Sequence, residues 1–120
     1  MGIINDKDFW EALDVLVAGS EIIVDRSKGS THPRFQSLIY PLDYGYLKGT
    51  TAMDGGGIDI WRGSLIQPTV DAIICTVDLM KKDSEIKVLL GCTLEEMKIA
   101  YEFHNQGSVM KGMLIKRRIE

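Results

Sequence analysis

A chain of 120 residues and 13.4 kDa, 45% hydrophobic and 26% charged, has the composition of one soluble globular domain. This composition excludes a disordered or collagen-like chain, and no apolar run approaches the roughly 18–20 residues of a membrane-spanning helix. The net charge of −3 argues against a nucleic-acid-binding protein, and the one dense basic run, Lys116–Arg118, is expected to be a solvated tail. The N-terminal segment is acidic where a secretory signal would be basic, so we expect a cytoplasmic protein.

The chain opens with apolar residues at helical spacing, which predict a helix over Asp6–Ala18 that Asn5 or Asp6 can cap and that Gly19 ends. Runs of β-branched and aromatic residues between turn signals then predict six strands, the last of which has an extended tail as its alternative. They are expected at Glu21–Asp25, Phe35–Ile39, Ile58–Leu65, Ala72–Met80, Glu85–Cys92 and Met110–Lys116. The stretch Tyr40–Gly57 is rich in tyrosine and glycine and has little periodicity. We expect an irregular segment that carries the functional site.

A second helix is predicted after the fifth strand. Thr93 and Glu96 have the spacing of a capping box, and the helix should end before Gly107. The residues expected to face the core are Trp10, Leu13, Val17, Met97, Tyr101 and His104. A packed, hydrogen-bonded core position is expected for His104 in preference to a catalytic one. The fold class expected for residues 1–120, as a single domain, is α+β: a small antiparallel β-barrel flanked by an N-terminal and a C-terminal helix.

Several carboxylates lie within about two residues of predicted strand ends, where they can converge on one mouth of a barrel. They are Asp25, Asp54, Asp59, Asp78, and Asp83 or Glu85. Clustered carboxylates repel one another unless a cation neutralises them, and oxygen ligands favour Mg²⁺ or Mn²⁺ over zinc. The alternative is that such acids are solvated turn residues. Asp59 is the exception, because it lies within the apolar run Gly57–Trp61, where an unpaired charge is costly.

The segment Tyr40–Thr50, Tyr-Pro-Leu-Asp-Tyr-Gly-Tyr-Leu-Lys-Gly-Thr, and the following Asp54-Gly55 and Asp59 resemble the soluble family I inorganic pyrophosphatases. The hallmark of that family is Tyr-Pro-x-x-Tyr-Gly-x-Ile-x-x-Thr followed by Asp-Gly-Asp-Pro-x-Asp. Looser similarity covers about positions 21 to 90. It includes Asp25–Ser30, which resembles Glu-Ile-Pro-x-Gly-Ser, and Arg34–Gln36, which stands where the family has Lys-Tyr-Glu.

The resemblance implies an OB-like β-barrel whose acidic mouth binds Mg²⁺ (with Mn²⁺ as a substitute) and pyrophosphate or another phosphorylated small molecule. Carried over by position, the implied metal ligands are Asp54, Asp59 and Asp78, with Asp83 or Glu85 as a fourth and Asp25 as a weaker fifth. Phosphate contacts are implied for Arg34, Tyr44 and Lys87, and a catalytic role for Asp59 and Tyr44. A homo-oligomer is expected, without nucleic-acid or membrane partners.

Three departures from the family pattern weaken this catalytic set. Gly56 stands where the family has the central Asp that orients the nucleophilic water. The hairpin between Gln36 and Tyr40 is too short to carry the family's phosphate-binding Arg, and Asn105-Gln106 replaces a Tyr-Lys pair. Two hypotheses follow: a Mg²⁺-dependent phosphoanhydride hydrolase with a degraded active site, or a non-catalytic descendant that binds a phosphorylated ligand or a partner protein.

Overall fold

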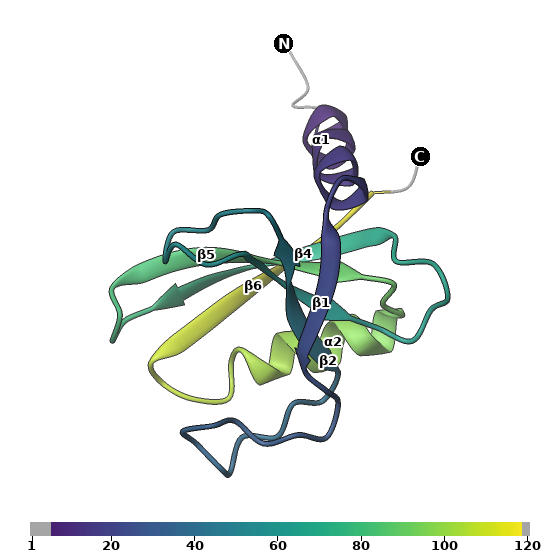
Figure 1. Cartoon of the computed structure of the whole chain (residues 1–120). Coiled ribbons are helices and arrows are strands. Elements are labelled where there is room, and N and C mark those ends of the chain that lie inside the picture. The colour runs from purple at the N-terminus through teal and green to yellow at the C-terminus, as the bar shows by residue number, and fades with distance from the viewer. Residues whose placement is uncertain (1–5, 119–120) are drawn as a thin grey trace.

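The computed structural model describes residues 6–118 and shows two helices and one six-stranded sheet (Figure 1). In chain order the elements are α1 (Lys7–Ala18), β1 (Glu21–Arg26), β2 (Asp43–Lys48), β3 (Ile58–Arg62), β4 (Val70–Asp78), β5 (Asp83–Leu90), α2 (Leu94–Phe103) and β6 (Met110–Lys116). The expected α+β class and both expected helices are confirmed. Neither α1 nor α2 has the length and apolar character needed to cross a membrane.

The sheet is mixed and open, which corrects the expectation of an antiparallel barrel. Its strands lie in the order β1-β2-β3-β5-β4-β6, and β3 pairs with β5 in parallel while every other pair is antiparallel. Within residues 6–118, β1 and β6 form the two edges and do not pair with each other. The hydrophobic pattern predicts where strands lie, but it does not specify which strands pair at the two ends of a sheet.

The segment expected to be irregular contains a regular strand, β2. Its Tyr44, Gly45 and Tyr46 pair with β1 on one side and with β3 on the other. Conversely, the strand expected at Phe35–Ile39 is reduced to one isolated bridge between Thr31 and Ile39. Glycine is unfavourable in a strand unless another backbone approaches closely, and that is the case at Gly45.

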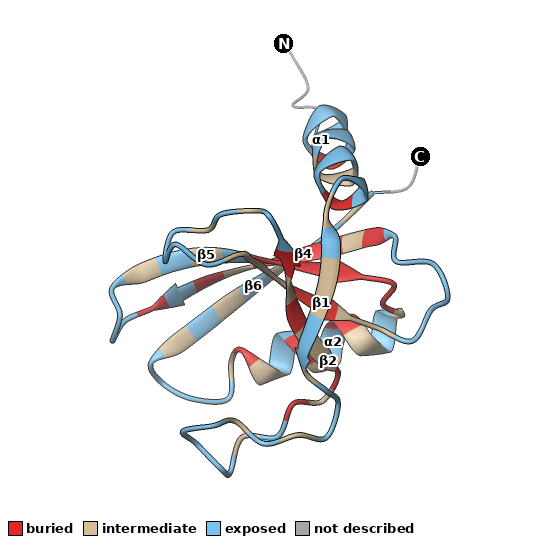
Figure 2. Cartoon of the chain, viewed as in Figure 1, coloured by how far each residue is buried: buried red, intermediate tan, exposed pale blue. Residues whose placement is uncertain are grey.

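The two faces of the sheet bury two separate hydrophobic clusters, because successive side chains of a strand point to opposite sides. Along β5, Leu89 packs into the cluster beneath α2, whereas Val88 and Leu90 pack into the cluster beneath α1. We refer to these two sides as the α2 face and the α1 face. Figure 2 shows the buried residues gathered in the middle of the sheet.

The helices bury most of the residues expected to face the core. Trp10 and Val17 of α1 and Met97 of α2 are buried, as is His104 at the end of α2. Leu13 of α1 is half-buried, while Tyr101 of α2 remains 38% exposed, so the prediction for Tyr101 was wrong.

The capping box is confirmed, with Thr93 Oγ1 accepting from the Glu96 amide at 3.1 Å and Glu96 Oε1 accepting from the Thr93 amide at 2.9 Å. Asp6 is the residue before α1 but makes no side-chain cap bond. The other expected cap, Asn5, lies outside the described residues.

The C-terminal basic run is not simply a solvated tail. Arg117 makes a bidentate ion pair with Asp14 of α1, at 2.7 and 2.8 Å, and its guanidinium lies 5.8 Å from the centre of the Trp10 ring. These contacts join the end of the chain to α1, which projects from the sheet in Figure 1.

Candidate functional site

A cluster of four polar side chains lies on the α2 face, beside the hydrophobic cluster of that face. We call Tyr44, Asp59, Glu85 and Lys87 the carboxylate–lysine network. Tyr44 comes from β2, Asp59 from β3, and Glu85 and Lys87 from β5. Asp59 is two residues before the buried Trp61, and Lys87 is two residues before the buried Leu89. The period of two in a strand therefore places both charged groups on the face that buries Trp61 and Leu89.

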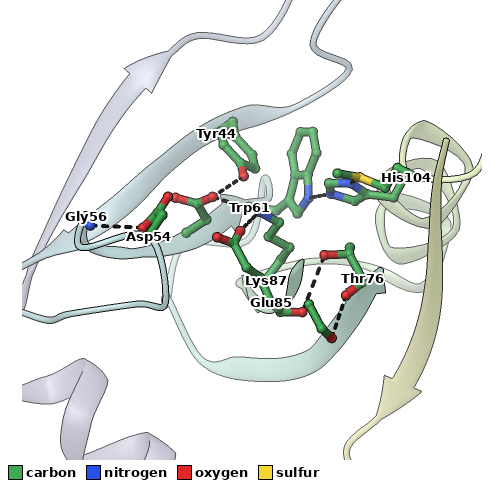
Figure 3. A network of polar contacts seen from close by, with 11 residues as sticks. Tyr44, Asp54, Gly56, Trp61, Thr76, Glu85, Lys87 and His104 are labelled. Carbon is green, nitrogen blue, oxygen red and sulfur yellow. Dashed lines mark hydrogen bonds and ion pairs between the residues drawn. The ribbon is translucent and has the colours of Figure 1, made fainter. Parts of the chain in front are cut away.

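Asp59 and Lys87 form the centre of this network. Figure 3 shows Lys87 with Tyr44 and Glu85 near it. Asp59 Oδ2 accepts from the Tyr44 hydroxyl at 2.6 Å and from Lys87 Nζ at 2.8 Å. Lys87 Nζ also donates to Glu85 Oε1 at 2.7 Å, so one ammonium joins two carboxylates from different strands. The side chain of Lys87 is 6% exposed and that of Glu85 13%, whereas that of Asp59 is 30% exposed. Asp59 is thus the carboxylate of the network that solvent reaches most easily.

The electrostatics of the network keep its donors protonated. Burial by itself would lower the pKa of Lys87, but the Asp59 and Glu85 carboxylates outweigh it and raise that pKa. Burial, together with the Asp59 charge, raises the pKa of Tyr44 well above its usual value. The network therefore sets the carboxylates of Asp59 and Glu85 against one ammonium and one neutral hydroxyl.

His104 lies next to this network but takes no part in it. Its Nε2 accepts from Trp61 Nε1 at 2.9 Å, and its Nδ1 is 3.3 Å from Met110 Sδ. Burial, helped by the positive charge of Lys87, lowers the pKa of His104 to about 3. The expectation of a packed, hydrogen-bonded core histidine is confirmed.

Of the other expected metal ligands, Asp54 and Asp78 accept hydrogen bonds from nearby backbone amides, and Asp25 is exposed. Asp54 Oδ1 accepts from the Gly56 amide at 2.9 Å, within the loop that precedes β3. Asp78 Oδ1 accepts from the Met80 and Lys81 amides, both at 3.0 Å, and so stabilises the β4–β5 hairpin, where Asp78 pairs with Asp83. Asp25 is exposed at the β1 edge, where the pairing with β2 is irregular.

These positions do not form a ready-made metal site. Across residues 6–118, no three His, Cys, Asp or Glu side chains lie together in a way that would hold a metal ion. The expected convergence of Asp54, Asp59 and Asp78 is therefore not seen. The two carboxylates that do come together, Asp59 and Glu85, already share the Lys87 ammonium. This donor set does not fit a resident Mg²⁺ ion.

Of the expected phosphate-binding residues, Tyr44 and Lys87 are in the network and Arg34 is outside it. Arg34 is exposed in the segment between β1 and β2, where its backbone amide donates to His32 Nδ1 at 3.0 Å. The sequence analysis did not decide between Asp83 and Glu85 as the fourth acidic residue of the site, and Glu85 is the one that lies in the network. Its spacing of two from Lys87 is the signal that favours it, because residues i and i+2 of a strand share a face.

Gly56 has room for a side chain. Its φ lies outside the left-handed region, and the nearest atom to a Cβ added there would be Asp54 Oδ1, at 3.4 Å. The absence of a carboxylate at this position is therefore not imposed by backbone strain.

No protein-family model and no curated protein matches this sequence. Among solved structures, the chain is similar to an inorganic pyrophosphatase from Coxiella burnetii, with 16% sequence identity and a TM-score of 0.46. The similarity covers 82% of this chain and 79% of that one. At this level of similarity, the function has to be argued from the residues of the site.

Proposed function

We propose that this protein is a divergent, Mg²⁺-dependent pyrophosphatase-like hydrolase that cleaves pyrophosphate, or a related phosphoanhydride, at the carboxylate–lysine network. One observation supports the proposal above all others. Tyr44, Asp59 and Lys87 were assigned to one site by motif resemblance, and they come from three different strands. In the fold they are joined by hydrogen bonds of 2.6 and 2.8 Å.

The network offers two of the functions that such a hydrolysis needs. The partly exposed Asp59 would accept a proton from the attacking water, while Tyr44 and Lys87 hold its carboxylate in place. Two protons of the Lys87 ammonium are used by the carboxylates, and the third would donate to a phosphate oxygen. Water would add to one phosphorus and the bond to the bridging oxygen would break, which gives two phosphates.

The magnesium ion would arrive as part of the substrate, as a Mg²⁺–pyrophosphate complex. Mg²⁺ keeps several waters and commonly binds through one or two carboxylates and substrate phosphates. A single carboxylate could meet that requirement through the oxygen that does not face Lys87 Nζ, and the ion would offset the negative charge of the phosphates.

Phosphate release measures this activity directly. With Mg²⁺ or Mn²⁺ present, the purified protein should release phosphate from pyrophosphate, nucleoside triphosphates or polyphosphate. Asp59→Asn should lower that rate by about 10²-fold or more, because the amide cannot accept the proton. Asp8→Asn, an exposed acid-to-amide change in the first turn of α1, is the matched control and should keep the wild-type rate. Equal rates in the wild type and in Asp59→Asn would contradict the assignment.

A second candidate function is favoured by a specific observation. Gly56 supplies no carboxylate to orient a water, and Lys87 already neutralises the two carboxylates that could bind a metal. Both features would slow hydrolysis more than they would weaken binding. On this account the protein would bind a phosphorylated ligand or a partner protein without cleaving a phosphoanhydride.

Gly56→Asp separates the two candidates. The backbone at Gly56 accepts a side chain, so the variant should fold, and it adds a carboxylate next to Asp54. If the hydrolase proposal is right, Mg²⁺-dependent phosphate release should rise at least about tenfold, a fraction of what general-base assistance typically contributes. Gly107→Asp, at a position where an added Cβ meets nothing within 4 Å, controls for the added charge. A folded Gly56→Asp protein with no gain in rate would favour the non-catalytic function.

A further inference from the structure

We propose that Lys87 is a built-in counter-ion, occupying the place between Asp59 and Glu85 where a divalent cation would otherwise bind. The site thus assembles without metal, and removing the ammonium should convert it into a metal site. This inference concerns the site of the proposed function, but it rests on the charges and contacts of the network and needs no hydrolysis.

The geometry is that of a cation held by two anionic ligands. A single atom, Lys87 Nζ, is 2.8 Å from Asp59 Oδ2 and 2.7 Å from Glu85 Oε1. Ca²⁺ binds carboxylate oxygens at about 2.3–2.6 Å and Mg²⁺ at about 2.0–2.1 Å. The two oxygens would therefore have to move by less than about 1 Å each to bind a metal ion placed where the ammonium lies. Neither strand backbone would have to separate from its neighbours.

The charges of Asp59 and Glu85 explain why a positive group must lie between their two carboxylates. Asp59 comes from β3 and Glu85 from β5, and burial leaves their side chains 30% and 13% exposed. Without Lys87, two like charges would face each other with little water between them, which is strongly unfavourable. They would then take up a proton or bind a cation, and a divalent ion would compensate both charges at once.

The wild-type protein should consequently bind free metal weakly. A divalent ion that approaches Asp59 and Glu85 is repelled by the buried Lys87 ammonium. This ammonium cannot move away without leaving both carboxylates unpaired. This agrees with the absence, within residues 6–118, of any group of three potential metal-ligating side chains.

Lys87→Met tests the inference, since methionine keeps the unbranched shape and removes the charge. Thermal unfolding would be followed with and without Ca²⁺ or Mn²⁺, with no substrate present. Without metal the variant should be less stable than the wild type. With metal its Tm should rise by roughly 5–10 °C, whereas that of the wild type should stay unchanged. Terbium luminescence offers a second readout, because Trp61 and Tyr44, with ring centres 4.6 Å apart, adjoin the site and can sensitise a bound ion.

Two further variants make every outcome decisive. Lys87→Met combined with Glu85→Gln leaves one carboxylate and should lose the metal response. Lys87→Gln, which keeps a hydrogen-bond donor, repeats the test if the methionine variant does not fold. The inference is overturned if neither single variant is stabilised by metal, including the case in which neither folds when metal is present. It is also overturned if the wild type binds metal as tightly as they do. A wild-type protein that releases no phosphate, together with Lys87 variants that are stabilised by metal, would count against the proposed function alone.

Discussion

Gly45→Ala should lower the free energy of unfolding by more than about 3 kcal/mol, because an added methyl would collide with backbone and not with a movable side chain. A Cβ on Gly45 would lie 1.7 Å from the carbonyl oxygen of Ile23, 2.7 Å from the carbonyl carbon of Ile23 and 2.9 Å from Val24 Cα. Strand β1 would have to move away from β2. Because Tyr44 precedes Gly45, the hydrogen bond from Tyr44 to Asp59 would be disturbed as well.

Urea unfolding of the wild type and Gly45→Ala measures this effect. Gly107→Ala is the matched control, since a Cβ there meets nothing within 4 Å and the residue's φ is outside the left-handed region. We expect Gly107→Ala to change stability by less than about 0.5 kcal/mol. A Gly45→Ala protein as stable as this control would show that β1 does not pack against β2 as described.

Acid should destabilise the protein through His104. Burial, aided by Lys87, lowers the folded-state pKa of His104 to about 3, against an ordinary value of 6.5. Between these two pH values the unfolded chain binds a proton that the folded chain does not, so stability falls as the pH falls. From pH 7 to pH 4.5 this one group should cost about 2–3 kcal/mol, and its contribution should be constant above about pH 7.

His104→Gln isolates this contribution, because the amide oxygen can still accept from Trp61 Nε1 but the side chain no longer titrates. The free energy of unfolding of this variant should decline less between pH 7 and pH 4.5 than that of the wild type. His32→Gln is the control at the chain's other histidine, which lies in the segment between β1 and β2, and it should keep most of the wild-type slope. Parallel pH profiles for the wild type and His104→Gln would contradict the assignment.

Local signals in the sequence were sufficient to place most elements. The capping box at Thr93 and Glu96, and the strand Met110–Lys116, are found where they were expected. Strand β2 was missed because its Asp43, Gly45 and tyrosines look like a loop when the neighbouring strands are unknown. Gly45 is tolerated there only because β1 approaches so closely, and that is a tertiary contact.

The candidate site was predictable where residues matched a family motif. Asp59 and Tyr44 lie in the motif, and Lys87 was assigned by its resemblance to a lysine of the family. Hydrophobic alternation would have placed Lys87 in solvent, yet Lys87 is buried and the neighbouring Ile86 is exposed. The choice between Asp83 and Glu85 required the β4–β5 register, in which Asp83 pairs with Asp78 at the hairpin end. The engagement of Asp54 and Asp78 by nearby backbone amides depends on loop conformation, which hydrophobic periodicity does not describe.

Nuclear magnetic resonance of the ¹⁵N-labelled protein, titrated with Mg²⁺ and imidodiphosphate, tests the central claim most directly. In this pyrophosphate analogue an N–H replaces the bridging oxygen, so binding is observed apart from cleavage. The account predicts that the largest changes in backbone amide shifts occur around Tyr44, Asp59 and Lys87, the network residues of β2, β3 and β5. Shifts confined to α1 or to the β6 edge, or no shifts at millimolar ligand, would contradict it.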